Sequence, residues 1–329
     1  MTDRRVRIVV GFDGSPTSLL ALNWALTEAR LRDGIVMLCH VSPGRRASGD
    51  FPDTPDSPGD SPGDSSDAPG DERMATAQRV LARGVRHASR QAPAVRVIPE
   101  LLFGGPAHQL LSAASGAALL VVGARGEDGF PGLRLGSVSA QVARHATCTV
   151  IVVPGLVDRA GNQRHRQIVV GVDGSTGSRA ALAFAFAEAA DRQAEVRAVY
   201  VFDAATLQTM ASLQRKDLLR LHVRAADTLH GLVTAQAEHD PDIEICCEVL
   251  SGAPATTLTA AAAGAELLVL GSRGHGDIAA LMLGSTSHNV LHNATCPVAV
   301  IRGDPHADPT GSRHRVRVRD RGSLVRGGS

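Results

Sequence analysis

Short, unbroken apolar runs alternate along the chain with longer segments in which apolar positions recur every three to four residues. The runs are rich in β-branched residues, as is typical of strands buried on both faces of a parallel sheet, and the periodic segments indicate amphipathic helices. In the first half we predict strands at 7–12, 35–41, 95–102, 118–123 and 148–153, and helices at 16–33, 72–91, 106–115 and 137–145. The second half repeats this alternation, with its long second helix at 216–239. The pattern predicts α/β architecture with a doubly wound parallel sheet in each half and helices on both faces.

Several motifs occur twice in the same order, which indicates a tandem duplication. The repeated pairs are RIVVGFDGS at 7–15 and QIVVGVDGS at 167–175, FGGPA at 103–107 and LSGAPA at 250–255, GARGEDGFPGLRLGS at 123–137 and GSRGHGDIAALMLGS at 271–285, and ATCTVIVV at 146–153 and ATCPVAVI at 294–301. The first pair is offset by 160 residues and the later pairs by 148, so the first half contains twelve extra residues between them.

The extra length is explained by residues 42–72, which are acidic, rich in Pro and Gly, and almost free of apolar side chains. Such a segment buries too little apolar surface to offset its ordering entropy, so we predict a disordered acidic insertion. Residues 303–329 are polar and mildly basic, and we expect a disordered tail there. The predicted organisation is a first domain at 1–154, a linker at 155–165 and a second domain at 166–302.

Composition narrows the class of protein. The chain of 329 residues is 43% hydrophobic and 20% charged, as is typical of globular proteins, and its net charge of +1 gives no reason to expect a nucleic-acid or membrane partner. Its five cysteines have no metal-ligand spacing, and the first residues lack the apolar core of a signal peptide. We therefore expect a reduced, cytoplasmic protein, and we assign no metal ligand and no histidine-based site.

A candidate ligand site follows from the sheet. Ligands of doubly wound sheets bind beyond the carboxyl ends of strands, where the strand order reverses. Asp13 follows the first predicted strand, and the glycine-rich loop that begins at Gly123 follows the fourth. If these strands are neighbours, Asp13 and the loop face one crevice.

Each part of the loop has a plausible role toward a phosphorylated ligand. Gly123 and Gly126 allow close backbone approach or a positive φ. Gly136 and Ser137 open a helix whose N-terminus attracts anions, and the Ser137 hydroxyl can cap that helix or reach a phosphate oxygen. Arg125 supplies a forked cation suited to phosphate, and Asp13 can accept hydrogen bonds from a ribose. Together these features indicate a nucleotide site, although Asp13 and Asp173 can also be turn residues and Arg125 and Arg273 surface charges.

The loop is neither of the two common phosphate-binding motifs. The pattern GxxxxGK[ST] is absent, and the only lysine, Lys216, is far from both loops in the sequence. A Rossmann loop follows the first strand of its domain, whereas this loop follows the fourth. Instead, the motifs IVVGxDGS, GxPA and Gx2Gx9GS, followed by a helix and a Cys-Pro-Val strand, resemble the universal stress protein family in a tandem, two-domain form.

The resemblance implies a five-stranded parallel sheet of order 3-2-1-4-5 in each half, pairing of the domains through their last strands, and ATP binding in the branch that keeps the glycine pattern. The implied site residues of the first half are Asp13, Val41, Val122, Gly123, Arg125, Gly126, Gly136, Ser137 and Val138. Those of the second half are Asp173, Val201, Leu270, Gly271, Arg273, Gly274, Gly284, Ser285 and Thr286. Within the first loop, the acids Glu127 and Asp128 lower the expected phosphate affinity or hold a divalent cation, and Arg134 can offset their charge.

The interpretation is an ATP-binding stress-response protein that acts through nucleotide-dependent conformation or partner binding. No catalytic residue is identified, so an enzyme is not the first expectation. A slow ATP hydrolase and a scaffold that binds no nucleotide are the alternatives. We expect an adenine nucleotide as ligand, with Mg²⁺ left open, and a pseudo-dimer of the two domains within one chain, with a homodimer of the whole chain left open.

Overall fold

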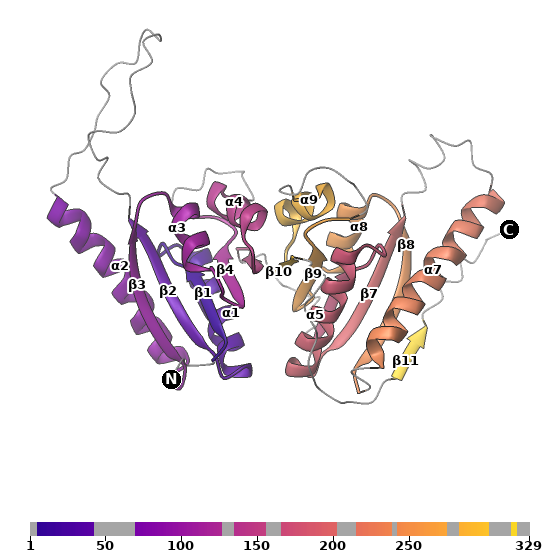
Figure 1. Cartoon of the computed structure of the whole chain (residues 1–329), viewed down its shortest axis with the longest axis horizontal. Helices are drawn as coiled ribbons and strands as arrows, with labels where there is room; N and C mark the ends of the chain where they lie inside the picture. Colours follow the sequence, from indigo (N-terminus) through magenta and orange to yellow (C-terminus); the bar gives the residue numbers. More distant parts are fainter. Residues whose placement is uncertain are drawn as a thin grey trace, which may run out of the picture.

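The computed structural model describes residues 5–42, 70–126, 135–155, 166–202, 215–238, 242–274, 283–302 and 317–320. Two α/β halves lie side by side on one continuous sheet (Figure 1). The first half contains β1 (Arg7–Gly11), α1 (Pro16–Leu31), β2 (Ile35–Ser42), α2 (Gly70–Gln91), β3 (Arg96–Phe103), α3 (Pro106–Ala113), β4 (Leu119–Gly123), α4 (Ser137–His145) and β5 (Thr149–Val153). The second contains β6 (Gln167–Gly171), α5 (Thr176–Arg192), β7 (Glu195–Phe202), α7 (Arg215–Ala237), β8 (Glu244–Ser251), α8 (Pro254–Ala261), β9 (Leu267–Gly271), α9 (Ser285–Asn293) and β10 (Val298–Ile301).

With β11 (Arg317–Asp320) at one end, the sheet has the order β11-β8-β7-β6-β9-β10-β5-β4-β1-β2-β3. Within each half this is the order 3-2-1-4-5 with parallel pairing throughout, so the predicted doubly wound fold is confirmed. One buried cluster joins α1, α2, α5 and α7 to one face of the sheet, and a second joins α3, α4, α8 and α9 to the other. The strand order therefore reverses between β1 and β4 and again between β6 and β9, beside the two glycine loops.

The two halves meet at their last strands. β10 pairs with β5 in antiparallel fashion, with Ala299 opposite Ile151, and both side chains are fully buried. These two residues correspond to each other through the 148-residue offset, so a pseudo-two-fold axis passes between them. The strands that we expected to pair between domains thus complete one sheet within a single chain.

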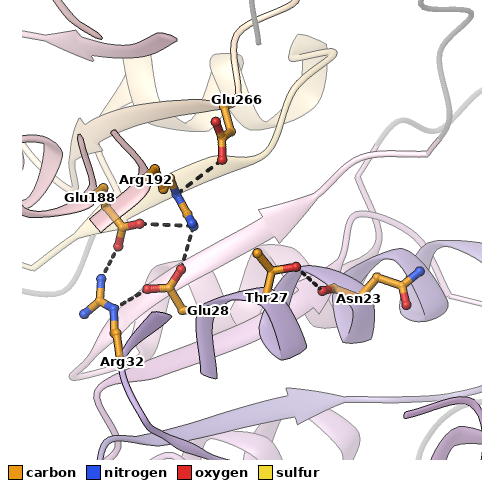
Figure 2. A network of polar contacts seen from close by, with 7 residues as sticks. All are labelled: Asn23, Thr27, Glu28, Arg32, Glu188, Arg192 and Glu266. Carbon is orange, nitrogen blue, oxygen red and sulfur yellow. Dashed lines mark hydrogen bonds and ion pairs between the residues drawn. The ribbon is translucent and has the colours of Figure 1, made fainter. Parts of the chain in front are cut away.

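A buried ring of charges joins the halves on the face covered by α1 and α5 (Figure 2). Arg32 pairs with Glu28 on its own helix and with Glu188 on α5. Arg192 pairs with the same two glutamates. Its Nη2 lies 2.5 Å from Glu28 Oε2 and 3.1 Å from Glu188 Oε2. The contact with Glu188 is an ion pair without hydrogen-bond geometry. The four residues are two equivalent pairs at the 160-residue offset, so the ring obeys the same pseudo-symmetry as the strands.

Aromatic side chains flank both arginines. The Arg32 guanidinium lies 5.8 Å from the centre of the Phe184 ring, and that of Arg192 lies 5.3 Å from the Trp24 ring. Each contact again crosses from one half to the other, and the faces of aromatic rings attract cations. Because Glu28 and Glu188 are fully buried, removing either arginine would leave a carboxylate in the interior with less opposite charge beside it.

The ring makes one carboxyl group hard to ionise. Burial, followed by the nearby charge of Glu28, raises the pKa of Glu188 from 4.5 to about 7, against the opposing effect of the two arginines. Between these two pH values the folded protein binds more protons than the unfolded chain does. The contribution of Glu188 to stability is therefore complete below pH 4.5 and is lost as the pH rises through about 7.

Part of the expected tail is structured. Residues Arg317–Asp320 form β11, which pairs in parallel with β8. The sequence RVRD alternates a β-branched residue with charges, and β8 would otherwise be an open edge, which favours the addition of a strand. The ends of the expected insertion also belong to regular structure, since Ser42 ends β2 and Gly70–Glu72 begin α2. Residues 43–69 and 156–165, the rest of the insertion and nearly all of the linker, lie outside the described ranges.

We predict that Glu188→Gln flattens the pH dependence of stability. Gln cannot ionise, so the variant avoids the loss, on the order of a few kcal/mol, that wild type incurs between pH 5 and 8. Urea unfolding across this range measures the free energy of unfolding. Glu266→Gln is the matched control, because Glu266 lies 3.5 Å from Arg192 at the partly exposed rim of the cluster. Equal slopes for wild type and Glu188→Gln would contradict the prediction.

Candidate functional site

The aspartates that follow the first strand of each half anchor a tight turn. Asp13 Oδ1 accepts a hydrogen bond from the Ser15 N–H at 2.9 Å, and Asp173 Oδ1 accepts one of the same length from Ser175. The intervening Gly14 and Gly174 both have φ of +89°, a conformation that favours glycine. The interpretation of Asp13 and Asp173 as turn residues is therefore correct.

The same aspartates also face the glycine loops. A Cβ added to Gly126 would lie 2.7 Å from Asp13 Oδ2, and one added to Gly274 would lie 2.6 Å from Asp173 Oδ2. The expected closeness of the aspartate after the first strand and the loop after the fourth is thus present in both halves. The second glycine of each loop is small so that the carboxylate can lie against the backbone.

The first glycine of each loop has a packing role. A Cβ on Gly123 would lie 2.7 Å from the Thr17 carbonyl carbon on α1, and one on Gly271 would lie 2.6 Å from that of Gly177 on α5. None of the four loop glycines, 123, 126, 271 and 274, has a positive φ. The suggestion of left-handed backbone at Gly123 and Gly126 is therefore wrong, and close approach of other protein atoms is the reason for glycine.

The two ends of each glycine loop are tied together. Gly136 N donates to Ala124 O at 2.7 Å, and Gly284 N donates to Ser272 O at 2.8 Å. These bonds bring the start of α4 and of α9 next to the carboxyl end of the fourth strand. Residues 127–134 of the first loop and 275–282 of the second lie outside the described ranges. Glu127, Asp128 and Arg134 are among them.

The helix that follows each loop begins with glycine as its N-cap. Gly136 and Gly284 hold that position, and Ser137 and Ser285 are the exposed first helical residues. The capping role expected for Ser137 is therefore wrong, because the N-cap residue has no side chain. The sequence analysis did not identify the role of the serine two residues further on. Ser139 Oγ donates a hydrogen bond to Gly123 O at 2.6 Å. Its equivalent, Ser287 Oγ, donates to Gly271 O at 2.8 Å.

In the second half these elements enclose a cavity of about 480 Å³. All nine residues expected for this site line it: Asp173, Val201, Leu270, Gly271, Arg273, Gly274, Gly284, Ser285 and Thr286. The expectation missed eight more lining residues, Gly171, Val172, Ser178, Val199, Pro254, Leu258, Leu283 and Ser287. The volume is within the range of small-molecule sites, roughly 300–1,000 Å³.

In the first half, the expected residues hold the corresponding positions on the strands and helix. Val41 lies near the end of β2, Val122 is buried near the end of β4, and Val138 is half-buried on α4. Arg125 is exposed, as is Arg273 in the second half. One local difference is that the Thr17 hydroxyl donates to the Arg125 carbonyl, whereas Gly177 stands at the equivalent position and has no side chain.

Two features of the described ranges bear on the class of site. No group of three or more His, Cys, Asp or Glu side chains there is arranged to hold a metal ion. No helix in those ranges is long and apolar enough to cross a membrane.

Comparison with known proteins identifies the family. The model of the universal stress protein family matches residues 5–154 and again 164–302, so this chain belongs to that family and carries two of its domains. Two universal stress proteins of Mycobacterium tuberculosis are 31% and 30% identical to it over 295 residues, which cover 90% of this chain and 96% of theirs. A universal stress protein of Mycolicibacterium smegmatis is 30% identical over 307 residues, covering 90% of this chain and 96% of the relative.

Solved structures support the fold. The universal stress protein of Archaeoglobus fulgidus DSM 4304 superposes with a TM-score of 0.63 at 21% identity and covers 91% of this chain and 97% of its own. A protein of unknown function from Pseudomonas aeruginosa PAO1 superposes with a TM-score of 0.60 at 15% identity, covering 92% and 94%. At these identities the likeness shows that two such domains in tandem form a recurrent architecture.

We predict that Gly271→Ala destabilises the second domain, because its Cβ would lie 2.6 Å from backbone carbon of α5. Overpacking of this kind costs about 1–3 kcal/mol. Gly231→Ala on α7 is the matched control: a Cβ there meets nothing within 4 Å, and the exchange in a helix stabilises by about 0.5–1 kcal/mol. Urea unfolding midpoints should move in opposite directions, and a neutral Gly271→Ala would refute the packing role.

Proposed function

We propose that this protein binds an adenine nucleotide, ATP in the first place, at the two glycine loops and serves as a cytoplasmic stress-response regulator. The observation that carries the proposal is the gathering of the nine expected residues around one cavity in the second half. These residues come from β7, β9, α9 and the loops that follow β6 and β9, so the fold, rather than nearness in sequence, assembles them.

The apolar part of the cavity suits a base and a ribose. Val172, Val199, Val201, Leu258 and Leu270 provide aliphatic walls against which a flat ring can pack. Asp173 lies between these walls and the glycine loop, where its carboxylate can accept hydrogen bonds from ribose hydroxyls. A nucleoside would thus lie over the ends of β6 and β7.

The polar part suits phosphates. Gly284, Ser285 and Thr286 form the N-terminus of α9, whose first N–H groups have no partner within the helix and favour anions. Arg273 lines the same end, and its guanidinium can form a charge-assisted pair with a phosphate. Hydroxyls of Ser285 and Thr286 add donors on that side.

Regulation is the best-supported role because the site offers binding groups and little for catalysis. Asp173 is the only carboxylate among the described residues that line the cavity, and its Oδ1 is engaged by the Ser175 N–H and hydroxyl. Any Mg²⁺ would arrive on the phosphates, since this ion is commonly held by one or two carboxylates plus substrate oxygens. A slow hydrolase and a scaffold without nucleotide are the outcomes that the tests below distinguish.

We predict that isothermal titration of the full chain with ATP gives close to two sites per chain, one for each glycine loop. Adenosine should compete, and phosphate release under the same conditions should stay at the background level. No heat and no thermal shift at millimolar ATP would leave the scaffold alternative, whereas steady phosphate release that is lost in Asp173→Asn would favour the hydrolase.

We predict that Arg273→Ala weakens ATP binding at the second site by about ten- to a hundredfold, because a charge-assisted hydrogen bond is worth roughly 1.5–3 kcal/mol. Arg125→Ala should act in the same way at the first site. The loss should be smaller for adenosine, which has no phosphate. The control is Arg90→Ala, which removes an exposed arginine in the last turn of α2. Equal losses for ATP and adenosine would show that these arginines do not contact phosphate.

A further inference from the structure

Two histidines lie one turn apart on α9, on the side of the helix away from its buried stripe. The rings of His288 and His292 have centroids 4.7 Å apart and planes inclined by 60°. Both side chains are half-buried, and the buried positions of the helix are Ser287, Val290 and Leu291. The spacing is His-x-x-x-His, and the expectation of no histidine-based site overlooked it.

The two imidazoles have little else to bind. Within the described part of the chain, neither ring nitrogen has a hydrogen-bond partner. A neutral imidazole offers a ring nitrogen as a ligand.

We propose that His288 and His292 together bind one divalent transition-metal cation of the Zn²⁺, Ni²⁺ and Cu²⁺ class, with water completing its coordination. Side chains four residues apart share one face of a helix, and paired histidines at this spacing are a recognised ligand arrangement. Imidazole suits these cations, whereas Mg²⁺ prefers oxygen ligands.

The ring separation fits a shared metal. With metal–nitrogen distances of about 2.0–2.1 Å and an angle between 90° and 110°, two imidazoles bound to one ion place their centroids about 4.5–5.3 Å apart. The observed 4.7 Å lies within that interval, so the separation of the two rings is compatible with one shared ion.

The position on the helix adds a favourable field. His292 lies in the last turn of α9, where the helix dipole is negative and attracts cations. The N-terminus of the same helix lines the cavity proposed for the nucleotide. α9 would then carry an anion at one end and a cation at the other, each in the field that favours it.

Titration of the full, chelator-treated chain with NiCl₂, followed by calorimetry and by thermal unfolding, tests the site. One Ni²⁺ should bind at this pair and raise the unfolding temperature, while MgCl₂ should not compete. His288→Ala and His292→Ala should each weaken this binding at least about tenfold, because each removes a ligand. Alanine is a good helix former, so both variants should keep the fold, which circular dichroism can check.

Two controls separate this pair from the other histidines. His145→Ala changes the single histidine of α4, the equivalent helix of the first half, and should leave Ni²⁺ binding unchanged. His292→Ala combined with Asn293→His keeps the number of histidines but moves one ring by about 100° around the helix, and should bind as weakly as His292→Ala alone. Unaltered affinity in His288→Ala and His292→Ala, or no Ni²⁺ bound by wild type at millimolar concentration, would overturn the proposal. Broadening of amide signals by Cu²⁺ should be confined to α9 and its neighbours, and broadening centred elsewhere would also overturn it.

Discussion

The antiparallel pairing of β5 with β10 is the interaction on which the rest of the architecture depends. It turns two five-stranded sheets into one and covers the apolar edge strand, β5 or β10, that each half would otherwise expose. The pairing also brings α1 beside α5, and only there can Glu28 and Glu188 find the arginines of the opposite half. Strand pairing and charge ring specify one register together, because a shifted sheet would leave charges buried without partners.

The candidate site shows how far ligand chemistry and packing share the same residues. The carboxylates of Asp13 and Asp173 hold their turns and lie against the second glycine of each loop at the same time. Gly123 and Gly271 allow the fourth strand of each half to pack closely against the first helix. A repeated glycine pattern is therefore evidence of a fold requirement as much as of a ligand, and the helix N-terminus beyond it carries the stronger indication of an anion.

The fold was predictable from sequence because strand and helix patterns, each present twice, fix the order of elements, and the strand order followed from the family resemblance. The nine residues of the second half were expected from the family resemblance and all line one cavity, while their role toward a nucleotide stays a prediction. The charge ring was not, since Glu28 and Arg32 have the i, i+4 spacing of an ordinary surface pair. The available signal was their recurrence as Glu188 and Arg192 at the same offset as the first motif.

Other features could not be predicted from the sequence, because they depend on backbone dihedrals or on contacts between distant segments. The N-cap of α4 and of α9 is glycine and not the serine that follows it, because backbone dihedrals decide which residue of a Gly-Ser pair begins the helix. β11 depends on the edge of a strand that is distant in sequence. Ser139 and Ser287 gain their partners only when α4 and α9 dock over the ends of β4 and β9.

The contact at the pseudo-two-fold axis has a consequence for how such proteins diverge. In a dimer of identical chains, a residue on the axis must face its own copy, so its volume enters the interface twice. Here Ile151 faces Ala299, a large side chain opposite a small one. This unequal pair is possible because both halves belong to one chain, so a substitution in one half is not repeated in the other. The same freedom extends to every position of the interface, so the two halves can acquire different surfaces while the pairing of β5 with β10 is kept.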